Sequence, residues 1–184
     1  YSLAANQNLP QAQLLIGFYY FTCVNSVPNI KKSTYYIMLA SINGERTANF
    51  IHGFLLHEGK NVKRDIDEAI HYYKEASSFN IHYAKNNLGI IFKHGFPDKI
   101  KKCIGNAIVY FEEAIRQKKD FLSMYNLAHL YMYDETIKEG INKSIELLIK
   151  SSDQFQPSKV LLCILLKPFK AYIAVAYKLL IFHI

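Results

Sequence analysis

Histidines and paired carboxylates are the side chains of this 184-residue chain that could do chemistry. His52 and His57 are five positions apart, a spacing that does not place two metal ligands on one face of a helix. No carboxylate stands four positions from either histidine. We therefore interpret His52 as a core residue. Adjacent or near-adjacent carboxylates are common on exposed helices, and we assign no acid–base role to the two pairs present, Asp65 with Asp67 and Glu112 with Glu113.

Motifs that carry catalysis or bind phosphate are missing from the sequence. There is no GxSxG, no Gly-rich phosphate loop, no HExxH and no Cys/His cluster with metal-ligand spacing. The three cysteines, Cys23, Cys103 and Cys163, form no CxxC motif. We expect no enzymatic activity, no catalytic residues, no metal and no cofactor. The cysteine pattern favours a reducing compartment, so we expect a cytoplasmic protein.

A helical hairpin recurs four times along the chain. A small residue, an apolar or core residue and then Gly or Ala recur at spacings of 36, 36 and 39 residues. A second set of marks recurs in register with the first, at spacings of 36, 38 and 37 residues. A period of this length is typical of a stacked array of helix pairs. The first marks are Ala12-Ile16-Gly17, Ala48-His52-Gly53, Ala84-Leu88-Gly89 and Ser123-Leu127-Ala128; the second are Ser33-Tyr36-Ala40, Ala69-Tyr72-Ala76, Ala107-Tyr110-Ala114 and Ser144-Leu147-Ser151.

The marks predict an all-α fold and the approximate ends of eight helices. Each hairpin has a first helix with a small residue that lets two backbones approach, and a second helix with large rings beside it. Asp65 is expected to cap the second helix of the second hairpin. We expect first helices near residues 11–22, 47–57, 82–94 and 121–133, and second helices near residues 30–41, 66–79, 103–117 and 141–152.

The hairpins resemble the Sel-one-like repeat (SLR) family, a relative of the tetratricopeptide repeat. The resemblance covers about residues 1–153 and implies an α-α superhelix, or solenoid, of about four helix-turn-helix repeats with partial or degenerate terminal units. The first unit departs from the family pattern at Ser26 and Asn29. The second unit matches through Gly53, Gly59, Val62, Asp65, Ala69, Tyr72, Tyr73, Ala76 and Ser77, and the third through Leu88, Gly89, Ala107, Tyr110, Phe111 and Ala114.

The two ends of the chain are expected to differ from the central repeats. Residues 1–6 match the end of a second helix, so we expect a fragment or a processed piece. We assign residues 1–157 to the repeat array and residues 158–184 to degenerate capping helices, because the register dissolves after Asp153. Alternatives for this apolar end are a membrane-associated tail and an aberrant terminus that does not fold. Three lysines and a proline within it argue against a membrane span.

Family resemblance also implies a binding surface, because in helical-repeat relatives the first helices line the concave side. The ligand-facing positions lie three before, one after, and four or five after the Gly/Ala mark. An open alternative is that packing between repeats, or the C-terminal segment, covers these rings. The predicted lining residues are Leu14, Phe18, Phe21, Phe50, Phe54, His57, Asn86, Ile90, Lys93, His94, Tyr125, His129, Met132 and Tyr133.

Positive charge gathers in the loops between helices. The formal net charge is +7, and alignment of the repeats superposes several basic residues. We interpret them as a basic ridge along a solvated edge; the alternative is a surface for acidic partners or phosphates. No nucleic-acid-binding motif accompanies this charge. The ridge residues are Lys63, Arg64, Lys101, Lys102 and Lys138.

Three functions remain open from the sequence. The first is a non-catalytic protein–protein interaction scaffold or adaptor that binds a partner protein or peptide in an apolar, aromatic concave groove. The second is a repeat segment of a larger signalling enzyme, such as a protein kinase, whose catalytic domain lies outside this chain. The third is a peripheral membrane-associated adaptor. The sequence indicates neither the oligomeric state nor the identity of the partner.

Overall fold

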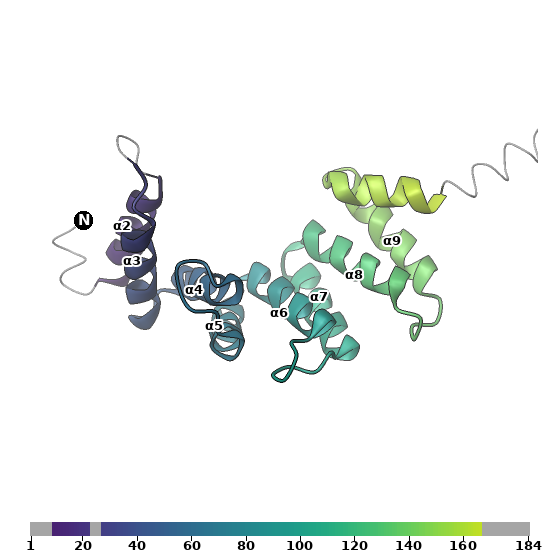
Figure 1. Ribbon diagram of the computed structural model, residues 1–184. Helices are drawn as coiled ribbons and strands as arrows, with labels where there is room; N and C mark the ends of the chain where they lie inside the picture. Colours follow the sequence, from purple (N-terminus) through teal and green to yellow (C-terminus); the bar gives the residue numbers. More distant parts are fainter. Residues whose placement is uncertain (1–8, 23–26, 167–184) are drawn as a thin grey trace, which may run out of the picture. The chain divides into compact units, whose positions relative to one another are not determined.

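A computed structural model describes residues 9–22 and 27–166 of the chain. Helices follow one another in pairs (Figure 1), and the described residues contain no strand beyond an isolated bridge between Phe96 and Ile100. The named helices are α2 (Pro10–Thr22), α3 (Ile30–Ile42), α4 (Arg46–Glu58), α5 (Ile66–Ser78), α6 (His82–His94), α7 (Ile104–Lys118), α8 (Phe121–Tyr133) and α9 (Gly140–Ser152). A further helix begins at residue 156 and is described as far as residue 166. The expected all-α helical repeat is thus confirmed, with helix ends within one residue of expectation.

The described residues divide into two compact units, one up to Gln117 and one from Lys118 onward. Helices α2 to α7 make up the first unit, and α8, α9 and the helix over 156–166 belong to the second. Within each hairpin the first helix packs lengthwise on the second.

Small residues of the first helices lie against large side chains of the second helices. A Cβ atom added to Gly53 of α4 would lie 3.0 Å from Cδ1 of Tyr73 and 3.1 Å from the carbonyl oxygen of Ala69, both in α5. A Cβ atom added to Gly17 of α2 would lie equally close to the side chain of Ile37 of α3. Glycine in a helix costs about 1 kcal/mol relative to alanine, and the close packing outweighs that cost here.

Side-chain caps fix where several helices begin. The Asp65 carboxylate accepts hydrogen bonds from the backbone N–H groups of Asp67 and Glu68, at 3.1 and 3.2 Å, which confirms its predicted role as the N-cap of α5. Glu45 caps α4 by accepting from the N–H of Ala48. Helix α4 ends at Gly59, whose φ of 69° is the left-handed conformation common after a helix.

His52 lies in the core, as predicted, with only 2% of its surface exposed. Its ring packs 4.1 Å from that of Tyr72, and its Nδ1 lies 3.2 Å from the hydroxyl of Ser41, which donates to Oδ1 of Asn49. Within the described part of the chain, His52 Nε2 is buried without a hydrogen-bond partner. Burial lowers the pKa of His52 to about 4, so the ring is neutral in the folded protein at pH 7.

The repeat marks extend past Asp153, where the sequence analysis expected them to dissolve. Ser158, in the helix over 156–166, is fully buried and shares a hydrogen bond of 2.7 Å with Ser151 of α9. With Leu162 and Cys163 it repeats the small-apolar-small pattern of the earlier first helices. The rest of the apolar C-terminal segment, residues 167–184, lies outside the described residues. Across the residues that are described, no helix has the length and apolar character to cross a membrane.

Candidate partner-binding groove

The position directly after each Gly/Ala mark leaves an apolar or aromatic side chain at the surface. In the first unit these side chains are Phe18 of α2, 40% exposed, Phe54 of α4, 37% exposed, and Ile90 of α6, which is half-buried. Phe21, at the end of α2, is also exposed. Burial of such rings by a partner would be favourable, because each removes apolar surface from water. We call Phe18, Phe21, Phe54, His57, Ile90, Lys93 and His94 the first-unit groove.

The position three before the mark is buried or half-buried in the three hairpins of the first unit. Leu14 is buried with Ala48 of the next hairpin, and Asn86 is only 2% exposed. Phe50 is half-buried, with its ring 6.1 Å from that of Tyr83 in the following hairpin. Leu14 and Asn86 are therefore corrected from surface residues to core residues. Leu14 packs against the following hairpin, which the offset in sequence does not reveal.

The C-terminal end of α4 carries an aromatic and cationic cluster. The ring of His57 lies 5.7 Å from the ring of Phe96, edge to face, and 6.1 Å from the ring of Tyr73. The guanidinium of Arg64 lies 4.9 Å from the centre of Phe96, while its Nε donates to the carbonyl oxygen of His57 at 2.9 Å. Lys60 Nζ stands 5.4 Å from the centre of the Phe54 ring. These contacts make this end of the groove aromatic and positively charged.

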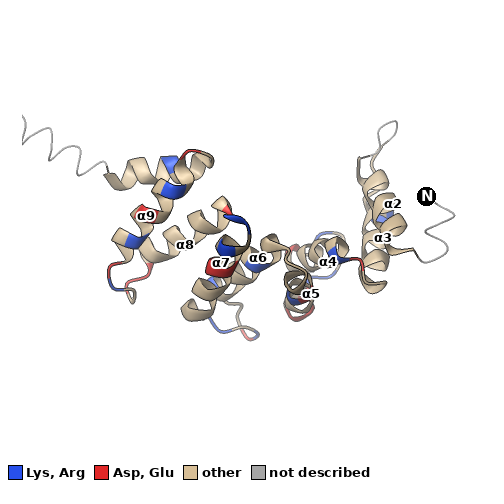
Figure 2. Ribbon diagram, turned by 180° about the vertical axis from the view of Figure 1, so that it is seen from behind, with Lys and Arg blue, Asp and Glu red and all other residues tan. Residues whose placement is uncertain are grey.

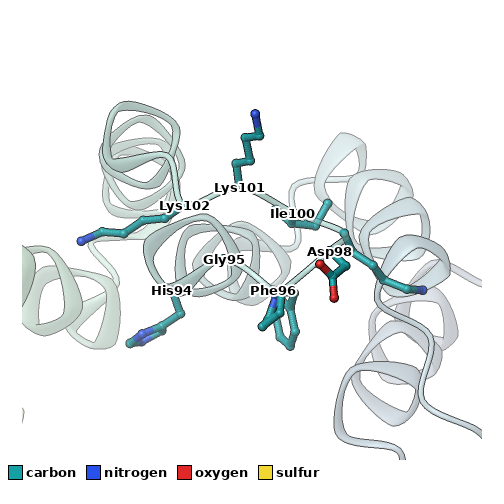
Figure 3. A pocket seen from close by; sticks show the side chains of 9 residues that line it. His94, Gly95, Phe96, Asp98, Ile100, Lys101 and Lys102 are labelled. Carbon is teal, nitrogen blue, oxygen red and sulfur yellow. The ribbon is translucent and has the colours of Figure 1, made fainter.

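The loop between α6 and α7 borders an open hollow of about 510 Å³ (Figure 3). Backbone hydrogen bonds between Phe96 and Ile100, at 2.7 and 3.0 Å, close the loop. Gly95 has a φ of 68°, and a side chain there would meet the backbone of Ile100 and Lys102. The loop is therefore fixed by its own backbone. The lining residues are His94, Gly95, Phe96, Pro97, Asp98, Lys99, Ile100, Lys101 and Lys102.

Lys99 ties this loop to the preceding hairpin. Its Nζ lies 3.1 Å from a carboxylate oxygen of Asp67 and 3.7 Å from one of Asp65, at the start of α5. The hydrogen bond to Asp67 is the main reason that the pKa of Lys99 is raised. All three side chains are largely exposed, so solvent weakens these ion pairs.

Burial and like charges lower the pKa values of basic groups near the end of α6. Burial is the main cause of the lowered pKa of Lys93, and the positive charge of Lys102 lowers this pKa further. The pKa of His94 is lowered first by burial and then by the positive charges of Lys93 and Lys102. Burial is again the first cause of the lowered pKa of His57.

All five residues of the proposed basic ridge are exposed, but their side chains do not point in one common direction. Lys101 extends away from His94 in Figure 3, and Arg64 lies over Phe96. Acidic segments also stand among the basic ones around α6 and α7 (Figure 2), where Lys85 pairs with Glu113 at 2.8 Å. Lys138 belongs to the second unit.

The second unit has an aromatic surface of its own. Along α8, Tyr125, His129 and Tyr133 form a row, with ring centres 6.3 Å apart for the first pair and 4.5 Å apart for the second, and Met132 is half-buried nearby. An apolar hollow of about 390 Å³ adjoins this row and is lined by Tyr125, Gln156, Pro157, Val160, Leu161 and Ile164.

Val160 and Ile164 are surface residues beside this row that were not predicted, although the sequence contains a signal for them. If Ser158, Leu162 and Cys163 are taken as a fifth set of marks, Val160 falls three before the last mark and Ile164 one after it. Both are more than half exposed.

The described residues contain no cluster of metal-ligating side chains. No three His, Cys, Asp or Glu side chains there lie close enough to hold a metal ion. Cys103 and Cys163 are free thiols. The side chains exposed on the candidate groove are aromatic, apolar and cationic.

Comparison with known proteins identifies the repeat. The Sel1 repeat model matches residues 47–78, 82–119 and 122–154, together more than half of the chain. The chain belongs to the Sel1 repeat family. Sel1 repeat proteins generally act as protein–protein interaction scaffolds and are typically non-catalytic. The hairpin of α2 and α3, which carries the same sequence marks, lies outside the three matched segments.

Solved structures of Sel1 repeat proteins share this fold at low sequence identity. One is c5321, a protective antigen of uropathogenic Escherichia coli with an SLR fold, at a TM-score of 0.76 and 18% identity, covering 86% of this chain and 33% of that one. Another is a Sel1 repeat protein from Oxalobacter formigenes, at a TM-score of 0.70 and 20% identity, covering 85% of this chain and 64% of that one. The chain thus spans less than two thirds of the length of either protein. No curated protein sequence matches it significantly.

Proposed function

We propose that this Sel1 repeat chain is a non-catalytic adaptor that binds a partner protein or peptide through the exposed aromatic face of its first helices. A cytoplasmic location is part of the proposal, because the cysteines fall at non-equivalent repeat positions and form no recurring pair.

One observation carries the proposal. At the position one after the Gly/Ala mark, Phe18, Phe54, Ile90 and His129 all keep part of their surface exposed, whereas Leu14 and Asn86, three before the mark, are buried. In α2 and α4, packing between repeats therefore uses one face of the helix and leaves a second apolar face partly exposed among the described residues. Recurring exposed aromatic side chains are typical of protein interfaces.

Phe54→Asp tests the proposal. An Asp at this partly exposed position should remove the apolar contact while leaving the core intact, so partners captured by the wild-type chain should be lost. Val109→Asp is the matched control, because Val109 is also an exposed apolar residue but lies on α7, a second helix. Affinity capture followed by mass spectrometry measures both variants.

Equal capture by wild type and Phe54→Asp would contradict the proposal. Circular dichroism melts must accompany the capture, because an unfolded variant also loses its partners. If Phe54→Asp unfolds, Phe54 is a core residue and the groove is wrongly assigned. The smaller change Phe54→Ser then gives an independent reading, since it shortens the side chain without adding charge.

A further inference from the structure

Arg64, in the loop between α4 and α5, is held by two contacts within the first unit. Its Nε donates a hydrogen bond of 2.9 Å to the carbonyl oxygen of His57, in the last turn of α4. Its guanidinium carbon lies 4.9 Å from the centre of the Phe96 ring. Both contacts are favourable, because the last carbonyl groups of a helix have no partner within the helix and an aromatic face attracts a cation.

The groups that hold Arg64 are themselves fixed. Phe96 packs against the core cluster that α4, α5 and α6 share, and backbone hydrogen bonds of 2.7 and 3.0 Å join it to Ile100. The loop that carries Arg64 is closed by the N–H of Asp65, which donates to the carbonyl oxygen of Leu56 at 3.1 Å. The guanidinium of Arg64 is therefore positioned by the fold before a partner binds.

The remaining donors of Arg64 are directed to no acceptor among the described residues. A guanidinium carries one N–H at Nε and further N–H groups at its two Nη atoms. Within the described part of the chain, the Nη groups donate no hydrogen bond and no carboxylate forms an ion pair with Arg64. The acidic residues at the two ends of the loop lie near other cations, Glu58 at 4.0 Å from Lys60 and Asp65 at 3.7 Å from Lys99.

Arg64 adjoins the exposed apolar part of the first-unit groove. Phe54 and His57 are three positions apart on α4, so their side chains lie on one face of the helix. The ring of His57 lies 5.7 Å from the ring of Phe96, over which the guanidinium of Arg64 stands. A segment with an apolar side chain against Phe54 would reach Arg64 within about five residues of extended chain.

We propose that the Nη groups of Arg64 bind a side-chain carboxylate of the partner, while an apolar side chain of the same segment lies against Phe54. This inference rests on the proposed function, because it names the chemistry of the partner at the same groove. Arginine binds a carboxylate through two parallel N–H···O hydrogen bonds. A phosphate group carries up to about two negative charges and is commonly bound by several arginines, whereas one positioned guanidinium matches the single charge of a carboxylate.

Short synthetic peptides test the inference with the full chain. Each contains two adjacent Leu residues and one Glu at a different distance from them, with Ser elsewhere, and each has a counterpart with Gln in place of Glu. Fluorescence anisotropy compares their affinities at about 0.15 M salt, where exposed charges more than about 8 Å apart are largely screened. At least one Glu peptide should bind about tenfold more tightly than its Gln counterpart, because hydrogen bonds between charged groups are stronger than neutral ones.

Variants of Arg64 show whether this preference for Glu comes from its side chain. Arg64→Gln should remove the preference and leave the affinity for the Gln peptide unchanged. A distorted loop would weaken both peptides alike, so the difference between them reports the direct contact. Arg64→Lys should also lose most of the preference, because lysine keeps the charge without the paired N–H groups. Lys63→Gln is the matched control, since it removes the same charge from the exposed neighbouring position, and it should change the preference by less than about twofold.

Three results would overturn the inference. They are the absence of any Glu peptide that binds more tightly than its counterpart, a preference that survives in Arg64→Gln, and an equal loss of preference in Lys63→Gln. Failure of the groove itself looks different. In that case Phe54→Asp leaves binding of the best Glu peptide unchanged, whereas failure of the carboxylate contact leaves binding sensitive to Phe54→Asp and insensitive to Arg64→Gln.

Discussion

Gly89 of α6 lies directly against the ring of Phe111 of α7. A Cβ atom on Gly89 would stand 2.6 Å from Cε1 and 2.7 Å from Cδ1 of that ring, closer than packed atoms allow. Phe111 is fully buried, so its ring has no free space into which it can turn. The hairpin can form in this geometry only because residue 89 has no side chain.

Gly89→Ala should therefore destabilise the protein by about 1 to 3 kcal/mol, the usual cost of overpacking a core. Gly105→Ala is the matched control, because a Cβ atom there would meet no atom within 4 Å. That change should be neutral or stabilise by up to about 1 kcal/mol, since alanine favours the helix. Urea unfolding curves of Gly89→Ala and Gly105→Ala measure the two effects. Equal unfolding midpoints would show that Gly89 is not required for close packing.

Acid should weaken the fold through His52. The pKa of His52 is about 4 in the folded chain and about 6.5 when unfolded, so the unfolded state binds more protons between these values. Stability is therefore highest above pH 6.5 and falls as the pH drops, by about 2 kcal/mol between pH 7 and pH 5 from this group. Burial also lowers the pKa values of His57 and His94, which act in the same direction.

His52→Leu isolates the contribution of this one group. Leucine keeps the apolar volume and cannot be protonated, so stability should fall less between pH 7 and pH 5 than in the wild type. Guanidinium titrations at several pH values give the curves. If the wild type and His52→Leu lose stability in parallel, the buried ring is not the group that responds to acid.

Substitution by Asp should destabilise the fold much more at Leu14 than at Phe54, although both were predicted to line the groove. Leu14→Asp places a charge in the core beside Ile37 and Ala48, and should cost more than about 3 kcal/mol. Phe54→Asp places a charge at a partly exposed site and should cost less than about 1 kcal/mol. Thermal melts followed by circular dichroism compare them. Similar losses in the two variants would show that exposure does not separate these positions.

Loss of the Asp65 cap should lower the melting temperature. Asp65→Ala removes the acceptor for two backbone N–H groups at the start of α5, and a decrease of about 2 to 4 °C is expected. Asp67→Ala is the control, since Asp67 pairs with Lys99 but accepts no capping hydrogen bond. Calorimetry measures both, and an equal decrease would mean that the ion pair, rather than the cap, supports this helix end.

The helices were predictable because each has a local signal at its ends and a periodic one along its length. Asp65 and Gly59 are an N-cap and a C-cap by type, and Gly53 and Gly89 repeat at the period of the hairpin. The identity of His52 as a core residue followed from its place in that period.

The groove was less predictable, because the sequence does not say which face of a first helix meets the next repeat. Leu14 and Phe18 are both apolar and four positions apart, yet Leu14 is buried while Phe18 is 40% exposed. The sequence assigned His94 and Lys102 to two different surfaces, whereas the loop after Gly95 brings the backbone of Lys102 back beside the end of α6. A fifth set of repeat marks follows Asp153 and begins with Ser158. It was not recognised, because Cys163 stands where the earlier units have Gly or Ala.

Tyr73 joins two neighbouring repeats through its hydroxyl. Asn87 of α6 donates to it at 3.0 Å, and Nδ1 of His57 of α4 lies 3.4 Å away, while the ring itself is fully buried in α5. The two first helices that present Phe54 and Ile90 are thus connected to the same buried atom. A partner would meet these side chains already held at their separation and would lose little affinity to ordering them. Preorganisation of this kind reduces the free-energy cost of binding.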